Sequence, residues 1–173
     1  KPSSVQAIAQ LKDMGLEPVL LTGDSEQVAK VVGAEVGVEK IIAGVMPEDK
    51  VTTVKRLQQE GRVVAMVGDG VNDAPALAKS EIGFAMGAAG TDTAIETADV
   101  ALMDDDLRKI PAFVHLSRQT HAILLQNIVL ALGIKAIFLA LTLAGEATMW
   151  MAVFADMGVS LMVVFNGLRL LRK

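Results

Sequence analysis

The chain has 173 residues, of which 52% are hydrophobic, and its mean hydropathy is +0.46. This is too apolar for an ordinary soluble domain, and the apolar excess is concentrated after Ala122. The net charge of −4, without a basic cluster, argues against nucleic acid as a partner, and the absence of cysteine excludes disulfides and thiolate metal sites within these residues. We therefore expect two parts with different solvents.

The first part alternates predicted helices and strands. Apolar periodicity predicts a first helix that Ser3 or Ser4 caps and Gly15 ends. Strands are expected at 18–21, 40–43, 62–67, 82–86 and 99–103, with further helices at 24–37, 48–59 and 92–98. This alternation predicts an α/β domain built on a parallel sheet with right-handed crossovers.

The second part carries two long apolar segments. Residues 107–119 have mixed charge at helical spacing and are expected to continue as one helix into the segment at about 122–144. This segment and the one at 149–168 are long enough to cross ~30 Å of hydrocarbon at 1.5 Å per residue, the second only just. The connection at 145–148 is so short that it predicts an antiparallel transmembrane hairpin.

Basic residues predict the orientation of this hairpin. They lie at both of its open ends: Arg108, Lys109 and Arg118 at one, and Arg169, Arg172 and Lys173 at the other. This places both ends in the cytoplasm and the loop with Glu146 outside. We expect an integral protein of the plasma (inner) membrane, with a cytoplasmic domain at 1–118, a membrane part at 119–173 and the lipid bilayer as a partner.

Two acidic loops follow predicted strands, where open parallel sheets bind ligands. In the loop at 68–73, Asp69 and Asp73 can converge on a hard cation such as Mg²⁺. Thr22 offers a hydroxyl at a helix N-terminus, and Lys50 can neutralise a phosphoryl group. Each feature alone also has an ordinary explanation, with Asp24 as a helix cap, Asp69 in a simple turn and Lys50 as a solvated residue. Their combination favours phosphate chemistry.

Three strings resemble the phosphorylation domain of P-type ATPases: Leu21-Thr22-Gly23-Asp24, Met46-Pro47-Glu48-Asp49-Lys50 and the highly specific residues 66–77, with the order and spacing also matching. The resemblance extends to the end of the chain, including residues 166–170. It implies a partial Rossmann-like domain of the haloacid-dehalogenase type. It also implies that Asp69, with Asp73, binds the catalytic Mg²⁺. The catalytic residues it implies are Thr22, Gly23, Asp24, Lys50, Asn72 and Asp73, of which Thr22 and Lys50 would contact the phosphoryl group.

Members of this family form a covalent phosphoryl intermediate on the aspartate of an Asp-Lys-Thr-Gly loop, using ATP. That loop is absent from the sequence, as are the nucleotide-binding and actuator domains of the family. The chain also begins without methionine or a signal-like segment. We therefore expect a fragment that does not hydrolyse ATP alone and whose partner is the N-terminal part of the same polypeptide.

Two ionisable residues interrupt the apolar segments. Lys135 and Asp156 each cost from ~3 to over 10 kcal/mol in a bilayer unless paired or hydrated. Counted from the loop they lie at depths of ~15 and ~11 Å, which is close enough for pairing. We predict that Asp156 binds a transported divalent cation with Lys135 as its partner, the alternative being a structural salt bridge.

The surroundings of these residues resemble the zinc-, cadmium- and lead-exporting branch, which has Gly133-Ile134-Lys135 and Ala155-Asp156-Met157-Gly158 in the matching helices. Copper exporters have an asparagine and tyrosine, then Met-X-X-Ser-Ser, and this chain has no tyrosine. The resemblance implies export of Zn²⁺, Cd²⁺ or Pb²⁺ without ranking them. The alternatives are a copper exporter, a truncated non-catalytic membrane fragment, and a soluble haloacid-dehalogenase-like phosphatase, which the hairpin argues against.

Overall fold

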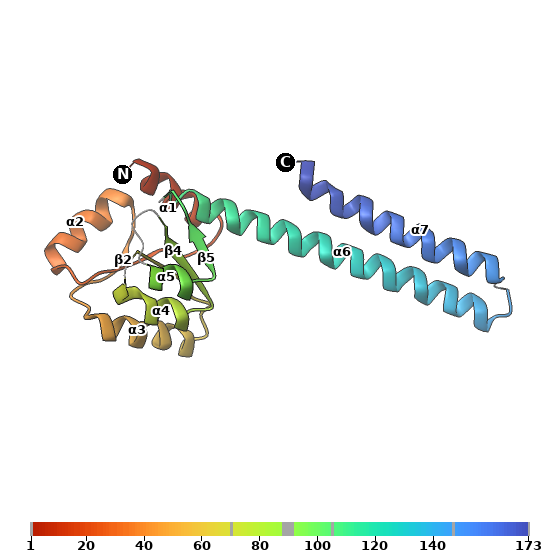
Figure 1. Cartoon of the computed structure of the whole chain (residues 1–173), viewed down its shortest axis with the longest axis horizontal. Coiled ribbons are helices and arrows are strands. Elements are labelled where there is room, and N and C mark those ends of the chain that lie inside the picture. Colours follow the sequence, from red (N-terminus) through yellow and green to blue (C-terminus); the bar gives the residue numbers. More distant parts are fainter. Residues whose placement is uncertain (1, 70, 88–91, 105, 147, 173) are drawn as a thin grey trace. The chain divides into compact units, whose positions relative to one another are not determined.

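The computed structural model describes residues 2–69, 71–87, 92–104, 106–146 and 148–172. The chain divides into two compact units, Lys1–Pro111 and Ala112–Lys173 (Figure 1). Gly70 of the predicted phosphate loop, Ala147 of the predicted hairpin loop and Lys173 of the basic end lie outside the described residues.

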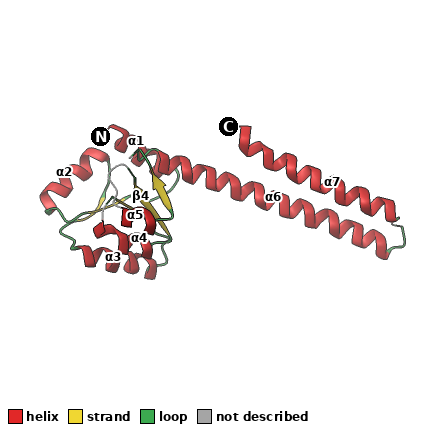
Figure 2. Cartoon of the chain, viewed as in Figure 1, coloured by secondary structure: helices red, strands yellow, loops and turns green. Residues whose placement is uncertain are grey.

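The first unit alternates helices and strands along the chain (Figure 2). The helices are α1 (Pro2–Asp13), α2 (Glu26–Val36), α3 (Pro47–Gln59), α4 (Ala74–Lys79) and α5 (Asp92–Thr97), with a 3₁₀ turn, η1 (Val71–Asp73), before α4. The strands are β1 (Val19–Leu21), β2 (Lys40–Ile42), β3 (Ala65–Gly68), β4 (Ile82–Met86) and β5 (Val100–Leu102). All described pairings are parallel, which confirms the predicted α/β class, but the strands form two sheets, β1-β2 and β3-β4-β5.

A hydrophobic cluster joins elements from both sheets. Its buried members are Val54, Met66, Ala76, Leu77 and Ala85. Leu21 at the end of β1 and Val51 of α3 pack against it. Because Leu21 immediately precedes Thr22 and Val51 immediately follows Lys50, burial of these apolar neighbours determines where the two polar residues lie.

The first helix differs from the prediction at its start. It begins at Pro2, so that Ser3 and Ser4 lie inside the helix and the prediction that one of them caps it is wrong. Proline suits the first helical turn because its φ is already helical and its missing N–H has no partner there. The predicted end is confirmed, since Gly15 has φ +77 and its N–H donates to the carbonyl of Lys12.

The third strand begins at Ala65, three residues later than predicted. The preceding residues complete the end of α3 instead. Gly61 has φ +79, and the N–H of Arg62 donates to the carbonyl of Leu57 at 3.1 Å. The N–H of Val64 donates to the carboxylate of Glu81 at 2.8 Å rather than to a neighbouring strand. The β-branched residues 63 and 64 favour a longer strand in the sequence. The contact that prevents it comes from Glu81, 17 residues after Val64, and a local pattern does not reveal it.

The second unit contains most of α6 (Lys109–Leu143), all of α7 (Met149–Leu168) and the 3₁₀ turn η2 (Arg169–Arg172). Both long helices are apolar and long enough to cross a membrane. The predicted continuous helix into the first apolar segment is confirmed by the 35 residues of α6, but it begins at Lys109, two residues later than predicted. Thr148 caps α7, since its hydroxyl accepts from the N–H of Met151 at 3.4 Å.

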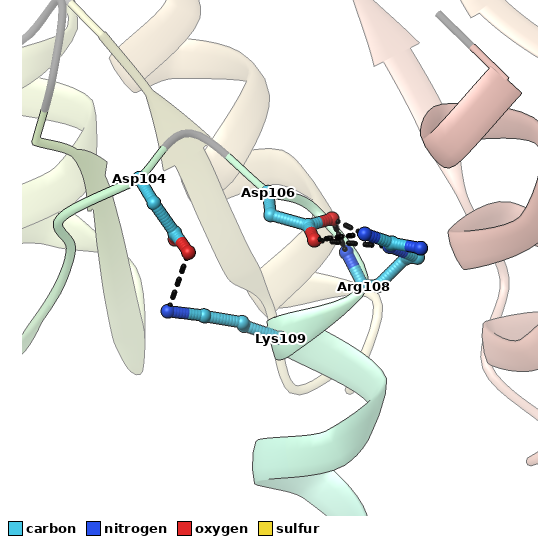
Figure 3. Close-up of polar contacts among 4 residues, drawn as sticks. All are labelled: Asp104, Asp106, Arg108 and Lys109. Atoms are coloured by element: carbon cyan, nitrogen blue, oxygen red, sulfur yellow. Dashed lines mark hydrogen bonds and ion pairs between the residues drawn. The ribbon is translucent and has the colours of Figure 1, made fainter.

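Two ion pairs surround the beginning of α6 (Figure 3). Arg108 Nη2 lies 2.6 Å from Asp106 Oδ2, and Lys109 Nζ lies 2.7 Å from Asp104 Oδ2. The carboxylate of Asp106 also accepts from the backbone N–H of Arg108 at 3.0 Å. The hydrogen bonds from the Arg108 side chain, and then this backbone bond, lower the pKa of Asp106 to about 2. A carboxylate at this position also suits the positive end of the helix dipole.

Candidate functional site

The loop after β1 is a closed turn around Thr22. The Thr22 hydroxyl donates to Asp24 Oδ2 at 2.9 Å and accepts from the Asp24 N–H at 3.2 Å. Its backbone continues the pairing beyond the strand, because its N–H donates to Ile42 and its carbonyl accepts from Val45. A Cβ on Gly23 would lie 3.3 Å from the Val45 carbonyl oxygen, so the turn is tightly packed at this glycine.

Asp24 does not act as a helix cap. The N-cap of α2 is Ser25, and its side chain makes no capping hydrogen bond. The ordinary structural explanation for Asp24 is therefore wrong. Its exposed carboxylate instead accepts from the Thr22 hydroxyl, which fixes the orientation of that hydroxyl at the end of β1.

Lys50 and Asp73 form the closest polar contact of the candidate site. Lys50 Nζ lies 2.5 Å from Asp73 Oδ1, and the two side chains are 17% and 11% exposed. The interpretation of Lys50 as a solvated helix residue is therefore wrong. Partial burial strengthens this charge-assisted hydrogen bond because the local dielectric is lower than that of water. The bond joins the first turn of α3 to the beginning of α4.

Gly68 makes room for this ion pair at the end of β3. A Cβ on Gly68 would lie 2.6 Å from the Cβ of Asp73 and 3.0 Å from its Oδ2. Contacts under 3.0 Å force something to move, so only glycine allows Asp73 to approach the strand this closely. The glycine of the acidic loop is needed here for space rather than for a special backbone conformation.

Asp69 and Asn72 are exposed beside this pair. Asp69 directly follows β3 and has no hydrogen bond or ion pair with another residue in the described ranges. In those same ranges no described contact joins Asp69 to Asp73, or Thr22 to Lys50. The structure thus brings Lys50 to Asp73 and Thr22 to Asp24 as two separate pairs.

Carboxylate oxygens fit Mg²⁺, which prefers hard oxygen ligands. No group of three or more histidine, cysteine, aspartate or glutamate side chains that could hold a metal occurs in the described part of the chain. Two carboxylates still suit Mg²⁺, because this ion usually keeps several waters and completes its shell with phosphate oxygens. The donor set of Asp69 and Asp73 therefore fits the ion only together with a phosphate and water.

In the hairpin, Lys135 of α6 pairs with Asp156 of α7. Their Nζ and Oδ1 atoms lie 3.8 Å apart, and both side chains are largely exposed within the chain. The two residues line an open pocket of about 180 Å³, with Phe138 and Val159 among its apolar walls. The structure forms the ion pair that their depths from the loop predict.

A second polar contact between these helices was missed by the sequence reasoning. Asn166 Nδ2 donates to Asn127 Oδ1 at 2.8 Å and lies 3.4 Å from Gln126 Oε1. Arg169 Nη1 donates to Asn166 Oδ1 at 3.1 Å. The available signal was two asparagines in apolar segments at similar numbers of residues from the loop, because an antiparallel hairpin brings such positions together.

Comparison with known proteins agrees with this geometry. The sequence model for haloacid dehalogenase-like hydrolases matches residues 1–80. The chain is 53% identical over 173 residues to a probable cadmium-transporting ATPase of Alkalihalophilus pseudofirmus, covering 99% of this chain and 24% of that protein. It is 50% identical to a zinc-transporting ATPase of Synechocystis sp., covering 98% of this chain and 24% of that protein.

The crystal structure of a zinc-transporting PIB-type ATPase in the E2·Pi state matches the fold with a TM-score of 0.93. The two are 47% identical, and the match covers 99% of this chain and 28% of that one. Over nearly its whole length the chain is similar to cadmium- and zinc-transporting P-type ATPases. It spans about a quarter of the length of the relatives that it matches.

These matches confirm the resemblance to P-type ATPases that the motifs indicated. The matches to the relatives run through both apolar helices, which a soluble phosphatase would lack, so that alternative is excluded. The named relatives are cadmium and zinc transporters, so the copper alternative is not favoured. The roles predicted for single residues are not tested by these comparisons and stay predictions.

Proposed function

We propose that the chain is part of an ATP-driven pump that exports divalent zinc, cadmium or lead through an aspartyl-phosphate cycle. The observation that carries the transport part is the Lys135–Asp156 ion pair, which lies between two helices apolar enough to cross a membrane. Charged residues at such depth are costly and mark ion pathways more often than packing contacts. The ATP-binding and phosphorylated groups come from the rest of the polypeptide.

Asp156 provides the carboxylate that binds the metal ion in this proposal. A carboxylate suits a divalent borderline cation, whereas Cu(I) prefers soft sulfur ligands. Lys135 neutralises the carboxylate when no ion is bound, because its ammonium lies 3.8 Å away. Arrival of a divalent ion then displaces the ammonium, and release allows it to return.

The cytoplasmic unit supplies the phosphate chemistry. Asp73 holds the Lys50 ammonium at 2.5 Å, and Lys50 in turn neutralises charge on the transferring phosphoryl group. The Thr22 hydroxyl, oriented by Asp24, contacts a phosphoryl oxygen. Asp69 would hold Mg²⁺ with support from Asp73, and this ion would supply positive charge to phosphate oxygens. Gly23 and Asn72 shape the same loops.

We further propose that the hairpin lies in the plasma (inner) membrane with both open ends in the cytoplasm. Arg108, Lys109 and Arg118 lie at one open end, and Arg169 and Arg172 lie at the other. Basic residues favour the cytoplasmic side of a membrane. Gly145 and Glu146, at the end of α6, then face outward.

The decisive experiment uses the full-length pump that contains this chain, in proteoliposomes. Asp156→Asn should abolish zinc- and cadmium-stimulated ATP hydrolysis, and Glu146→Gln in the loop serves as the matched control. Phosphorylation from inorganic phosphate should survive in Asp156→Asn, because the cytoplasmic unit is unchanged. Full metal stimulation in Asp156→Asn would mean that the ion pair is structural and that the transport role is wrong.

A further inference from the structure

A hydrogen bond between two asparagines joins α6 and α7 away from their connecting loop. Asn166 Nδ2 donates to Asn127 Oδ1 at 2.8 Å. We propose that this bond holds the two helices in register and thereby sets the separation of Lys135 and Asp156. Asn127 and Asn166 are then positioning residues for the metal site, an inference that rests on the proposed function of Asp156.

The two interhelical contacts follow one register. Asn127 lies eight residues before Lys135, and Asn166 lies ten residues after Asp156. At 1.5 Å per residue these steps are ~12 and ~15 Å along the helices, away from the loop in both cases. The loop therefore connects the two helices at one end, and the hydrogen bond between the asparagines connects them further along. The ion pair lies between these two connections.

Apolar packing alone specifies this register weakly. Among the described residues of the second unit only Val159 is buried. In a bilayer the lipid tails are as apolar as the side chains, so no hydrophobic force selects one helix pairing over another. A slip of one residue moves a side chain by about 1.5 Å along the axis and ~100° around it. Such a slip would change the distance of 3.8 Å between Lys135 Nζ and Asp156 Oδ1.

The orientation of the Asn166 amide is also determined. Its Oδ1 accepts from Arg169 Nη1 at 3.1 Å, which leaves its Nδ2 to donate towards α6. Gln126 Oε1 lies 3.4 Å from the same nitrogen and adds a weaker contact. A cation site at this position is disfavoured because the Arg169 guanidinium occupies the oxygen. The arrangement holds α6 and α7 at one position relative to each other.

The experiment measures metal dependence in the full-length pump reconstituted in proteoliposomes. Asn127→Leu, Asn166→Leu and the double variant are compared with wild type for zinc-stimulated ATP hydrolysis. Each single variant should raise the zinc concentration for half-maximal stimulation roughly 3- to 18-fold, the factors to which the mean and the largest strengths of interhelical hydrogen bonds in a membrane protein convert. The double variant should show no further rise, because either substitution already removes the bond.

Thr142→Val is the matched control. It also replaces a polar side chain of α6 by an apolar one, but the Thr142 hydroxyl donates to the carbonyl of Phe138 within the same helix at 2.8 Å. Leucine is better tolerated in a bilayer than asparagine, so insertion is retained. A merely structural role would lower the maximal rate with the amount of folded pump and leave the half-maximal zinc concentration unchanged.

Three outcomes would overturn the proposal: shifts no larger than that of Thr142→Val, additive shifts in the double variant, or a change in maximal rate alone. Asp156→Asn is measured in parallel. If Asp156→Asn keeps full stimulation, the proposed function itself fails. If Asp156→Asn loses stimulation while the asparagine variants behave like the control, only the positioning role fails.

Discussion

Lys50 of α3 and Asp73 at the beginning of α4 share a hydrogen bond of 2.5 Å although they are 23 residues apart in the chain. This bond connects the first turn of α3, which follows β2, to the beginning of α4, which follows β3. It also places an ammonium group beside the acidic loop, where charge would develop in the proposed phosphoryl transfer. The position of Lys50 is thus determined by a partner at the start of another helix of the candidate site.

Replacing Lys50 tests this arrangement. We expect Lys50→Met to slow phosphorylation of the full-length pump by ATP about 100-fold or more, as for removal of one electrostatic stabiliser. The free energy of unfolding should fall by about 1–3 kcal/mol, because Asp73 is left partly buried without its partner. Labelled ATP and rapid acid quenching measure the first effect, and thermal unfolding measures the second.

Lys55→Met is the control for this substitution. Lys55 lies on the same helix, is exposed and carries the same charge. It should leave phosphorylation unchanged, which separates the effect of the Lys50 contact from a general loss of positive charge. Equal phosphorylation rates in the two variants would contradict a role for Lys50 in phosphate binding.

The Thr22 hydroxyl provides a second test. Thr22→Val keeps the shape of the side chain but removes the donor to Asp24 and the acceptor for its N–H. We expect inhibition by orthovanadate to become weaker by about tenfold or more, because a hydrogen bond from the hydroxyl to a charged group is lost. Thr22→Ser should restore inhibition. Thr52→Val on α3 is the control, and the role is wrong if Thr22→Val behaves like it.

Gly68 tests the close approach of Asp73 to β3. Gly68→Ala should lower the free energy of unfolding by about 1–3 kcal/mol, because the new Cβ would lie 2.6 Å from the Cβ of Asp73. Phosphorylation should fall as Asp73 and Lys50 shift together. Gly167→Ala, whose Cβ would meet nothing within 4 Å, should be neutral or slightly stabilising. Equal thermal unfolding of both variants would refute the steric argument.

The ion pair at the start of α6 predicts an acid dependence. The pKa of Asp106 is lowered from 3.8 to about 2 by Arg108, so the folded protein prefers the carboxylate. This interaction contributes its full stability above about pH 4 and loses it as the pH falls towards about 2. Wild type should therefore lose stability more steeply in this window than Asp106→Asn, as measured by acid-induced unfolding. Asp13→Asn, at an exposed position of α1, should follow wild type.

Parts of the fold were predictable because they depend on neighbours in the sequence. The alternation of strands and helices, the end of α1 at Gly15 and the two long helices all follow from local periodicity and glycine placement. The predicted start of α1 was wrong because the helix begins at Pro2, before the two serines that were expected to cap it. The predicted start of β3 was wrong because the N–H of Val64 donates to the carboxylate of Glu81, 17 residues away, instead of to a neighbouring strand.

The sequence by itself determined which segments suit a bilayer and which two charges interrupt them, and it predicted which residues carry phosphate chemistry, because residue type and spacing are enough for those inferences. Only the tertiary structure decided that Lys50 pairs with Asp73, that Asp24 orients Thr22 and that Asn166 bonds Asn127. Hydrogen bonds act over about 3 Å, and chain folding decides which distant side chains come within that distance.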